Sequence, residues 1–459
     1  MKIIIHTEND PQDNAMLQAL YSRSAKSVTD HLERLSKTGS GKFMEQYYVG
    51  YGHNSIADCG FVTMYFEGIS MLAAKALEDN ALYNGQECSS RYIDFSEQHF
   101  VNPYLGTKHE AEATKLLDEY RNFYVTQLPL VKAHLTNNIP LEEGQDATAY
   151  DKAIQAKTFD VLRGFLPSGS TTNCSWTTSL RKAREHLELL ILHPLDEIQL
   201  IAAQAYVKLQ ERYLTSFPDL PVGATAYQLS DENFYSALPH RYISEFYIME
   251  ESADLFEAES FGSPLEVNSS KIGRPRRETP HKHDIFYKST FMHVRGCIDF
   301  GSFRDLQRHR GGYCSMPMID NESGFHDWYF NMMPETSHAA IEDLFVGISQ
   351  FLEKVSPLPN MVESATDNNY NLMCSVKFNN QYLLPMGTNV DVDLVYDYKQ
   401  LVYVTELRTQ QTVHPTLRAF AQKMVTAMED SQYYTNIHAN MSPDVFDIKR
   451  GTQDIVQKE

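Results

Sequence analysis

The run Arg304-Asp305-Leu306-Gln307-Arg308-His309-Arg310-Gly311-Gly312 indicates a duplicated fold, because the chain carries an earlier, altered copy of it. In that copy, Asp79-Asn80-Ala81 stands where Arg308-His309-Arg310 stands in the later one. The earlier copy continues into Gln86-Glu87-Cys88-Ser89-Ser90-Arg91-Tyr92, whereas the later copy has Met318 and Asp320 in place of Ser89 and Arg91. Each copy therefore carries half of one predicted site.

Further matches in the same order predict an internal duplication. Gly68 falls opposite Gly296, 228 positions later, and Phe165-Leu166-Pro167 falls opposite Leu383-Leu384-Pro385, 218 positions later. Each match alone is weak, but several in one order are rare by chance. We therefore expect two tandem lobes that share one order of elements.

The hydrophobic pattern supports this expectation, because each half contains an apolar strand-like run, a helix, a long amphipathic helix and a Leu-rich helix. The predicted elements are 61–66, 69–82, 108–135 and 180–192 in the first half, and 289–294, 298–310, 339–354 and 398–408 in the second. The sequence thus predicts an α+β fold in which each lobe combines a mixed or antiparallel sheet with long helices. The expected domains are an N-terminal lobe over 1–225, a connector over 226–280 and a C-terminal lobe over 281–459.

Composition narrows the function. A length of 459 residues suits two domains, and a net charge of -20 argues against a general nucleic-acid binder, since polyanion binding needs a broad basic surface. No apolar run is long enough to span a bilayer. The six cysteines lack metal-ligand spacing, which predicts free thiols, no metal site and a cytoplasmic protein. A small anionic ligand would need a local cationic pocket.

Two clusters could form such a pocket. Arg308 and Arg310, with Arg304 one turn earlier, place guanidinium groups near a helix end, where they could bind phosphate in a bidentate way. The alternative is a cation cluster that only complements the helix dipole. Glu87 and Arg91 flank Ser89 at alternate positions, so in an extended segment all three would face one ligand. The alternative there is an exposed polar edge strand.

These motifs together resemble the flavin-dependent thymidylate synthase (ThyX) family in a tandem-duplicated form. That family carries Gly-His, then Arg-His-Arg at a helix end, a Glu-x-Ser-x-Arg-Tyr run, an Arg-x-x-x-Pro step and a Leu-Arg on its last helix. Here the elements divide between the halves. The first half supplies His53, Ser55, Glu87, Ser89, Arg91 and Arg163, and the second supplies Arg304, Arg308, His309, Arg310 and Arg408.

The matching positions of the other half carry different residue types. Gln381 stands opposite Arg163, and Leu190 stands opposite Arg408. Since the family builds its sites between subunits, the resemblance implies one intact composite site and one decayed site in an intrachain pseudo-dimer. The sequence departs from the family at Asp305, where a glutamine is usual, and at Gly311 and Gly312, which follow Arg-His-Arg.

The resemblance also implies roles for these residues. The expected activity is conversion of dUMP to dTMP with FAD, NADPH and methylenetetrahydrofolate, without a metal, in a homodimer that mimics the family's tetramer. Arg408 is the expected catalytic residue, facing the uracil. Residues expected to bind the nucleotide are Glu87, Ser89, Arg91, Arg163, Arg304 and Arg308. Residues expected to bind FAD are Arg308, His309, Arg310, Ser55, His53 and Glu87.

Two alternatives stay open at this stage. The chain could be a related flavoenzyme acting on another pyrimidine nucleotide, because Asp305 and the two glycines alter the wall of the site. It could also be a non-catalytic relative that binds a nucleotide or a partner enzyme.

Overall fold

The computed structural model describes residues 1–7, 9–24, 26–38, 40, 54–80, 82–219, 256–262, 290–321, 323–355, 378–430 and 437–452. Its contacts divide the chain into two compact units. The first unit contains Met1–Cys88 and Thr171–Ile243, and the second contains Ser89–Ser170 and Ser244–Glu459. The units therefore do not follow sequence order. The lobe and connector boundaries predicted from the repeat stay a prediction, because a division by contacts does not locate the ends of a repeat.

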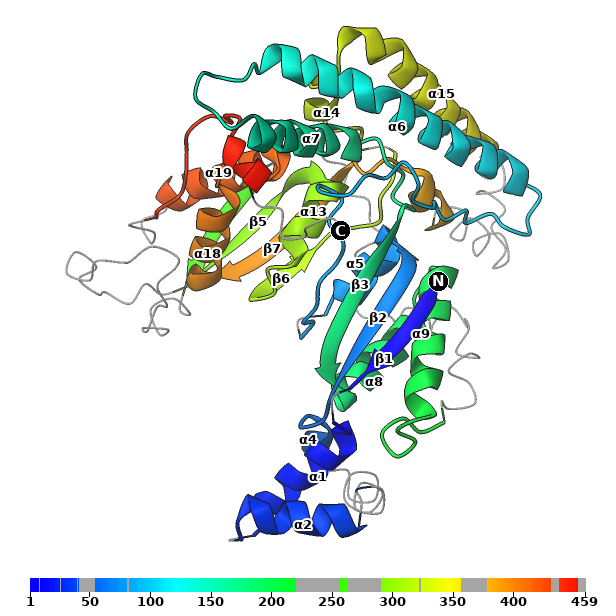
Figure 1. Cartoon of the computed structure of the whole chain (residues 1–459), viewed down its shortest axis with the longest axis vertical. Helices are drawn as coiled ribbons and strands as arrows, with labels where there is room; N and C mark the ends of the chain where they lie inside the picture. Colours follow the sequence, from blue (N-terminus) through cyan, green and yellow to red (C-terminus); the bar gives the residue numbers. More distant parts are fainter. Residues whose placement is uncertain are drawn as a thin grey trace, which may run out of the picture. The chain divides into compact units, whose positions relative to one another are not determined.

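The first unit contains a three-stranded antiparallel sheet in the order β1-β2-β3 (Figure 1). Its middle strand alternates, with Val62, Met64 and Phe66 buried and Phe61 and Tyr65 exposed, as one-sided burial requires. The strands are β1 (Lys2–His6), β2 (Phe61–Ser70) and β3 (Thr171–Ser179). The helices are α1 (Pro11–Tyr21), α2 (Val28–Thr38), α4 (Asn54–Ala57), α5 (Met71–Glu78), α8 (Leu180–Leu190) and α9 (Asp196–Gln210).

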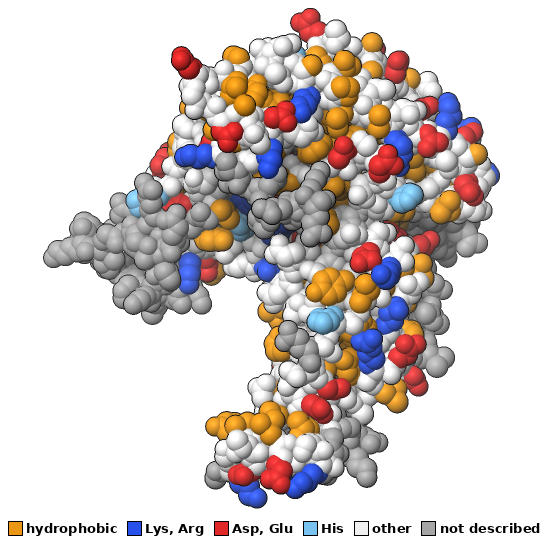
Figure 2. Space-filling view, viewed as in Figure 1, with side chains coloured by type: hydrophobic (Ala, Val, Ile, Leu, Met, Phe, Trp, Pro, Cys, Tyr) orange, Lys and Arg blue, Asp and Glu red, His pale blue; other side chains and the backbone are white. Residues whose placement is uncertain are grey.

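The surface of the first unit carries apolar side chains over α1 and α2 (Figure 2). The large exposed ones there are Tyr21, Val28 and Leu32. Both helices come from the first part of the chain, before the strand β2.

The second unit is built on a four-stranded antiparallel sheet in the order β4-β5-β7-β6. The strands are β4 (Phe256–Gly262), β5 (Thr290–Asp299), β6 (Gly312–Ser315) and β7 (Asn389–Asp397). The helices are α6 (Glu110–Asn138), α7 (Ala147–Arg163), α13 (Phe300–Gln307), α14 (Asp327–Asn331), α15 (His338–Val355), α18 (Tyr398–Arg408), α19 (Pro415–Asp430) and the 3-10 helices η3 (Glu335–Ser337), η4 (Gln381–Leu383) and η5 (Ile448–Thr452). Figure 1 shows the long helices α6 and α15 side by side, and they are in contact.

The predicted fold class is confirmed, because helices combine with antiparallel sheets in both units. Strand β4 lies inside the predicted connector, in which no strand was predicted. The division into two tandem lobes stays a prediction. Among the helices of the described residues, none is long and apolar enough to cross a membrane.

Each half contains two strand–helix units, and each unit matches one in the other half in length. β2 and β5 both have 10 residues, and α5 and α13 both have 8. Likewise β3 and β7 have 9 residues, and α8 and α18 have 11. These lengths place Ser70 and Asp299 at equivalent N-caps, and Asp79 and Arg308 at equivalent C-caps.

The predicted match of Gly68 with Gly296 is wrong, because the two glycines do not occupy equivalent positions in β2 and β5. Gly68 has a φ of 68° and lies at a β-bulge between β2 and β3, where a residue of positive φ is needed. Gly296 pairs with Val392 within a regular ladder. The two glycines therefore have different structural roles.

The two Leu-Pro segments pair with each other in a two-fold pattern. The amide of Ser168 donates to the carbonyl of Leu384 (2.8 Å), and the amide of Met386 donates to the carbonyl of Leu166 (2.7 Å). Each of these four residues lies 218 positions from its counterpart. A second pair repeats the pattern, from Gly169 to Tyr382 and from Gly387 to Gly164, at 2.8 Å each. Reciprocal contacts of this kind are typical of a two-fold interface between equal subunits.

Candidate functional site

The predicted site begins where β5 gives way to α13. Asp299 ends the strand and caps the helix, its Oδ2 accepting a hydrogen bond from the amide of Ser302 at 2.8 Å. The helix is only two turns long, so it ends at Arg308, the C-cap residue. This arrangement places Asp305 and Arg308 on the short helix that the buried carboxylate of Asp299 caps.

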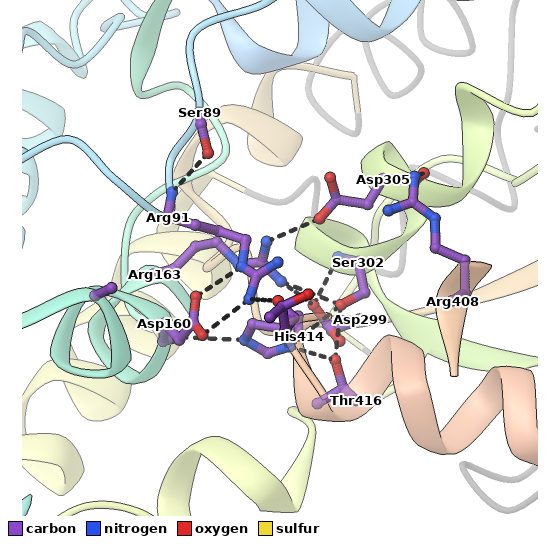
Figure 3. Close-up of polar contacts among 12 residues, drawn as sticks. Ser89, Arg91, Asp160, Arg163, Asp299, Ser302, Asp305, Arg408, His414 and Thr416 are labelled. Atoms are coloured by element: carbon purple, nitrogen blue, oxygen red, sulfur yellow. Dashed lines mark hydrogen bonds and ion pairs between the residues drawn. The ribbon is translucent and has the colours of Figure 1, made fainter. Parts of the chain in front are cut away.

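Arg163, at the last position of α7, reaches into this element. Its guanidinium donates to Ser302 Oγ (3.1 Å) and to Asp305 Oδ2 (3.3 Å), and it lies 3.7 Å from Asp299 Oδ2. The side chain is 1% exposed. Burial alone would lower the pKa of Arg163, but Tyr329 and the two carboxylates raise it above its usual value. Burial would raise the pKa of Asp299, and Arg163 lowers it below its usual range. Figure 3 shows this convergence.

Arg91 is held in the same way by a second buried carboxylate. Its Nε and Nη2 donate to Asp160 Oδ1 and Oδ2 at 2.7 and 3.1 Å, and Nη2 also donates to the carbonyl of Thr412 at 3.1 Å. The segment is not extended as predicted, because Ser89 Oγ accepts a hydrogen bond from the amide of Arg91 and the chain turns there. Short hydroxyl-to-backbone bonds of this kind compete with a strand.

Asp160 has a further partner that sequence reasoning missed. Arg450 donates to both carboxylate oxygens, with a distance of 2.8 Å from Nη2 to Oδ1. Burial would raise the pKa of Asp160, but Arg450 and Arg91 lower it well below its usual range. The sequence holds no signal for this contact, since 290 positions separate the two residues.

A buried chain of hydroxyl and imidazole groups lies beside these ion pairs (Figure 3). Thr416 Oγ1 is 2.7 Å from Ser302 Oγ and 2.8 Å from His414 Nδ1. The other imidazole nitrogen of His414 is 3.3 Å from the carbonyl of Asp160. Burial, followed by the nearby Arg163, lowers the pKa of His414 well below its usual value, so this histidine is neutral.

The partly exposed Arg408 and the buried His309 form a further part of the cluster. Arg408 Nε donates to His309 Nε2 at 2.8 Å, and Arg408 Nη2 donates to the carbonyl of Asp305. Because arginine only donates, Nε2 of His309 must be the unprotonated acceptor and Nδ1 carries the proton. Burial, with Arg408 next to it, lowers the pKa of His309 to about 3. His309 therefore orients Arg408 as a neutral base.

Asp305 links the two parts of the cluster. Burial would raise the pKa of its carboxyl group, but four guanidinium groups lower it far below its usual range. These are Arg308, Arg408, Arg163 and Arg91. Its side chain is about a fifth exposed, at 21%, so it lies at the edge of the buried region.

The cluster gathers guanidinium groups. Those that act on Asp160, Asp299, Asp305 or His309 belong to Arg91, Arg163, Arg308, Arg310, Arg408 and Arg450. In this part of the described chain, six guanidinium groups thus act on three carboxylates and one imidazole. Arg308 is exposed and Arg310 and Arg408 are partly exposed, so cations face solvent, whereas Arg91, Arg163 and Arg304 are buried.

The structure brings most of the predicted residues into one unit, although they come from both halves of the sequence. The second unit holds Ser89, Arg91, Arg163, Arg304, Arg308, His309, Arg310 and Arg408. The first unit holds Ser55, exposed on α4, and Glu87, buried and bridged to Cys174 of β3. His53 lies outside the described residues. The roles given to all these residues stay predictions.

The structure adds residues that the motifs did not indicate. They are Asp160, Asp299, Ser302, His414, Thr416 and Arg450. Only Asp299 had a usable signal, as an acidic residue between a strand and a helix, where an N-cap is expected. Among the described residues, no group of three or more His, Cys, Asp or Glu side chains is arranged to hold a metal ion.

Comparison with known proteins gives a family match and distant relatives. Residues 2–213, just under half of the chain, match the family described as Thymidylate synthase complementing protein. A UPF0159 protein of Chlamydia muridarum is 23% identical over 435 residues, covering 83% of this chain and 77% of the relative. A UPF0159 protein of Chlamydia pneumoniae is 21% identical over 432 residues, with the same coverage.

Two solved structures are also similar. One is the flavin dependent thymidylate synthase ThyX from Helicobacter pylori complexed with FAD and dUMP, with 16% identity, a TM-score of 0.30, and coverage of 48% of this chain and 99% of that chain. The other is the UMP/dUMP methylase PolB from Streptomyces cacaoi bound with 5-Br UMP, with 13% identity, a TM-score of 0.29, and coverage of 46% and 90%.

Proposed function

Residues 2–213 match the thymidylate synthase complementing protein family, which confirms the predicted resemblance over that range, and from this premise we propose that the chain methylates a pyrimidine nucleotide. The proposed reaction converts dUMP to dTMP with FAD, NADPH and methylenetetrahydrofolate. It takes place at one composite site built from both halves of the sequence. The proposed working form is a cytoplasmic homodimer.

The gathering of guanidinium groups in one unit carries this proposal. A nucleotide phosphate carries a charge of about -2, and arginine forks bind such groups in a bidentate way. The chain as a whole has a net charge of -20, so a cluster of six guanidinium groups is not a property of its general surface. Ser89 and Arg408 are partly exposed and Arg308 is exposed, so each of these three side chains reaches solvent.

The two-fold pairing of the Leu-Pro segments supports a single live site. It relates Arg163 to Gln381, since both precede their segments at the same offset of 218 positions. Gln381 is engaged by its own neighbourhood, as its side chain accepts from the amide of Ile319 and donates to the carbonyl of Phe378. Arg163 thus belongs to the guanidinium cluster, whereas the neutral side chain of Gln381, among the hydrogen bonds of the described residues, bonds only to backbone groups.

The donor set also fits FAD. A pyrophosphate needs several cationic donors, and the exposed Arg308 and partly exposed Arg310 would hold it. When bound, FAD would supply the hydride, with NADPH as its reductant and methylenetetrahydrofolate as the carbon donor. Ser89 and Arg91 would hold the nucleotide phosphate. Arg408, oriented by neutral His309, would stabilise negative charge that develops on the uracil ring.

A second candidate is a nucleotide-binding protein without catalysis. It is favoured by the ion pairs that already engage Arg91 and Arg163, because each faces a buried carboxylate. A ligand phosphate would have to compete with Asp160 and Asp299 for these two guanidinium groups.

Tritium release from dUMP labelled at C5, with FAD, NADPH and methylenetetrahydrofolate present, tests the main proposal. The wild-type chain should hold flavin, visible by its absorbance, and should release tritium, whereas Arg408→Met should bind nucleotide and release none. Bound flavin without tritium release would point to another pyrimidine nucleotide. Nucleotide binding without flavin would support the second candidate, and binding of neither would reject both.

A further inference from the structure

Asp160 holds two guanidinium groups where one would balance its charge. The carboxylate lies on α7, is 1% exposed, and accepts from Arg91 and Arg450 through both of its oxygens. A buried carboxylate with no partner is strongly destabilising, but a carboxylate with two cations keeps a partner when one of them leaves. One of the two arginines is therefore available for another anion.

Arg450 has the more independent anchorage of the two. It donates to the carbonyl of Ala156, and its guanidinium lies over the ring of Tyr92 at 5.4 Å. The helix η5 packs closely on α7 at the next residue, because a Cβ on Gly451 would lie 1.9 Å from the carbonyl oxygen of Ala149. Without its bonds to Asp160, Arg450 would still be held by these contacts.

Arg91 instead lies at the border between the two carboxylate clusters. It is carried by the turn after Ser89, and its charge acts on Asp305 and Arg408 as well as on Asp160. Apart from Asp160, its side chain donates only to the Thr412 carbonyl among the hydrogen bonds of the described residues that involve it. Arg91 is thus the guanidinium group of the two whose charge also acts on the Asp305–Arg408 part of the cluster.

We propose that Arg450 is the permanent counter-ion of Asp160, which allows Arg91 to turn from that carboxylate to the phosphate of a bound nucleotide. Arg450 is then a positioning residue that acts on the ligand through Asp160 and Arg91. The inference rests on the proposed function, because it assumes that a phosphate binds beside Arg91.

Calorimetric titration with dUMP, deoxyuridine and inorganic phosphate tests the proposal. Arg450→Gln should weaken dUMP binding by at least about tenfold, since Asp160 then retains Arg91. Deoxyuridine, which lacks the phosphate, should bind wild type and variant equally. The double variant Asp160→Asn with Arg450→Gln should regain dUMP affinity within about threefold of wild type, because a neutral side chain needs no counter-ion. Lys449→Met, at the exposed neighbouring position, is the matched control and should bind as wild type does.

The double variant separates a positioning role of Arg450 from a structural one. If Arg450→Gln only loosened the packing of η5 on α7, changing Asp160 would not restore dUMP affinity. Equal dUMP affinity in wild type and Arg450→Gln overturns the inference and leaves the proposed function intact. Failure of the double variant to recover, in protein that melts as wild type does, also overturns it. A wild-type chain that binds neither dUMP nor inorganic phosphate overturns the inference and the proposed function together.

Discussion

The strand–helix unit β2–α5 and the unit β5–α13 share their lengths but differ at their caps. Each has a strand of 10 residues followed by a helix of 8. In the first, Ser70 caps the helix by accepting from the amide of Ala73 at 3.0 Å, and Asp79 ends it. In the second, Asp299 caps the helix and Arg308 ends it.

This difference shows that the same strand–helix unit accepts different residue types at its N-cap and C-cap positions. Either serine or aspartate satisfies the first amides of a helix, so the fold does not choose between them. Asp299 adds a charge, which pairs with Arg163 at 3.7 Å, whereas Ser70 bonds to Glu197 at 2.5 Å and needs no cation. At the other cap, Asp79 lies 3.7 Å from Lys75 within its own helix, and Arg308 acts on Asp305 in the guanidinium cluster. One backbone thus supports a charged site in one unit and a local ion pair in the other.

The largest effect is expected from substitution of the two C-cap residues. Arg308→Ala should lower kcat/KM for dUMP by about 10²- to 10³-fold, because it removes a cation from the proposed anion site. Asp79→Ala, at the matched position, should leave kcat/KM within about threefold, since Asp79 pairs with Lys75 of its own helix and is not part of the proposed anion site. Steady-state assays of tritium release measure both. Equal losses of kcat/KM in the two variants would contradict the proposed difference between the two C-cap positions.

The N-cap residues should differ in their effect on stability. Asp299→Ala should lower the free energy of unfolding by about 3–5 kcal/mol, because it leaves the buried Arg163 without its nearest fully buried carboxylate. Ser70→Ala should cost about 1–2 kcal/mol, the usual loss of a cap. Urea unfolding followed by circular dichroism gives both values. A cost for Asp299→Ala no greater than that for Ser70→Ala would show that the ion pair adds nothing to the cap.

The paired Leu-Pro segments allow a smaller test. Gly169→Ala and Gly387→Ala should each destabilise the protein by about 1–3 kcal/mol, because the added Cβ has no room. It would lie 2.9 Å from the carbonyl oxygen of Tyr382 in the first case and 2.4 Å from the ring of Phe325 in the second.

Gly347→Ala in α15 is the control for these two variants. There the added Cβ would first meet the flexible side chain of Glu119, at 3.1 Å, and glycine is unfavourable within a helix. Its melting temperature should be unchanged or raised. Melting temperatures of Gly169→Ala and Gly387→Ala no lower than that of Gly347→Ala would argue against the close pairing.

The last prediction concerns pH. The folded state holds His309 with a pKa of about 3, whereas an unfolded histidine titrates near 6.5. Between these values the unfolded state binds one more proton, so stability falls as pH falls, by up to about 1.4 kcal/mol per pH unit. His309→Gln should remove this part of the slope between pH 6.5 and 4, as measured by urea unfolding across that range. A slope that is unchanged in the variant would mean that His309 is protonated in the fold.

Much of the fold could be predicted because it depends on local patterns. Alternating apolar residues predicted β2 and β5, and helical periodicity predicted α18 with its observed bounds, Tyr398–Arg408. The segment after Glu87 was predicted to be extended, and this was wrong because one serine hydroxyl holds the amide of Arg91 in a turn. The two glycines were matched by identity alone, and a bulge at Gly68 displaced them.

The site was predictable only where its residues form short motifs. The guanidinium groups of Arg308 and Arg408 stand in such motifs, but their counter-ions do not. Asp160 meets Arg91 across 69 positions and Arg450 across 290. Such contacts depend on how α7 packs against the C-terminal half, and no local pattern records that packing. For the same reason the sequence did not predict that α6 and α7 would join the second unit.

The number of dUMP molecules bound per chain tests whether the protein holds a single composite site. Calorimetric titration should give one dUMP per chain in the wild type and none in Arg308→Ala with Arg408→Met, because only one of the two related positions carries the cations. Two equivalent dUMP molecules per chain, or one that persists in the double variant, would contradict a single composite site.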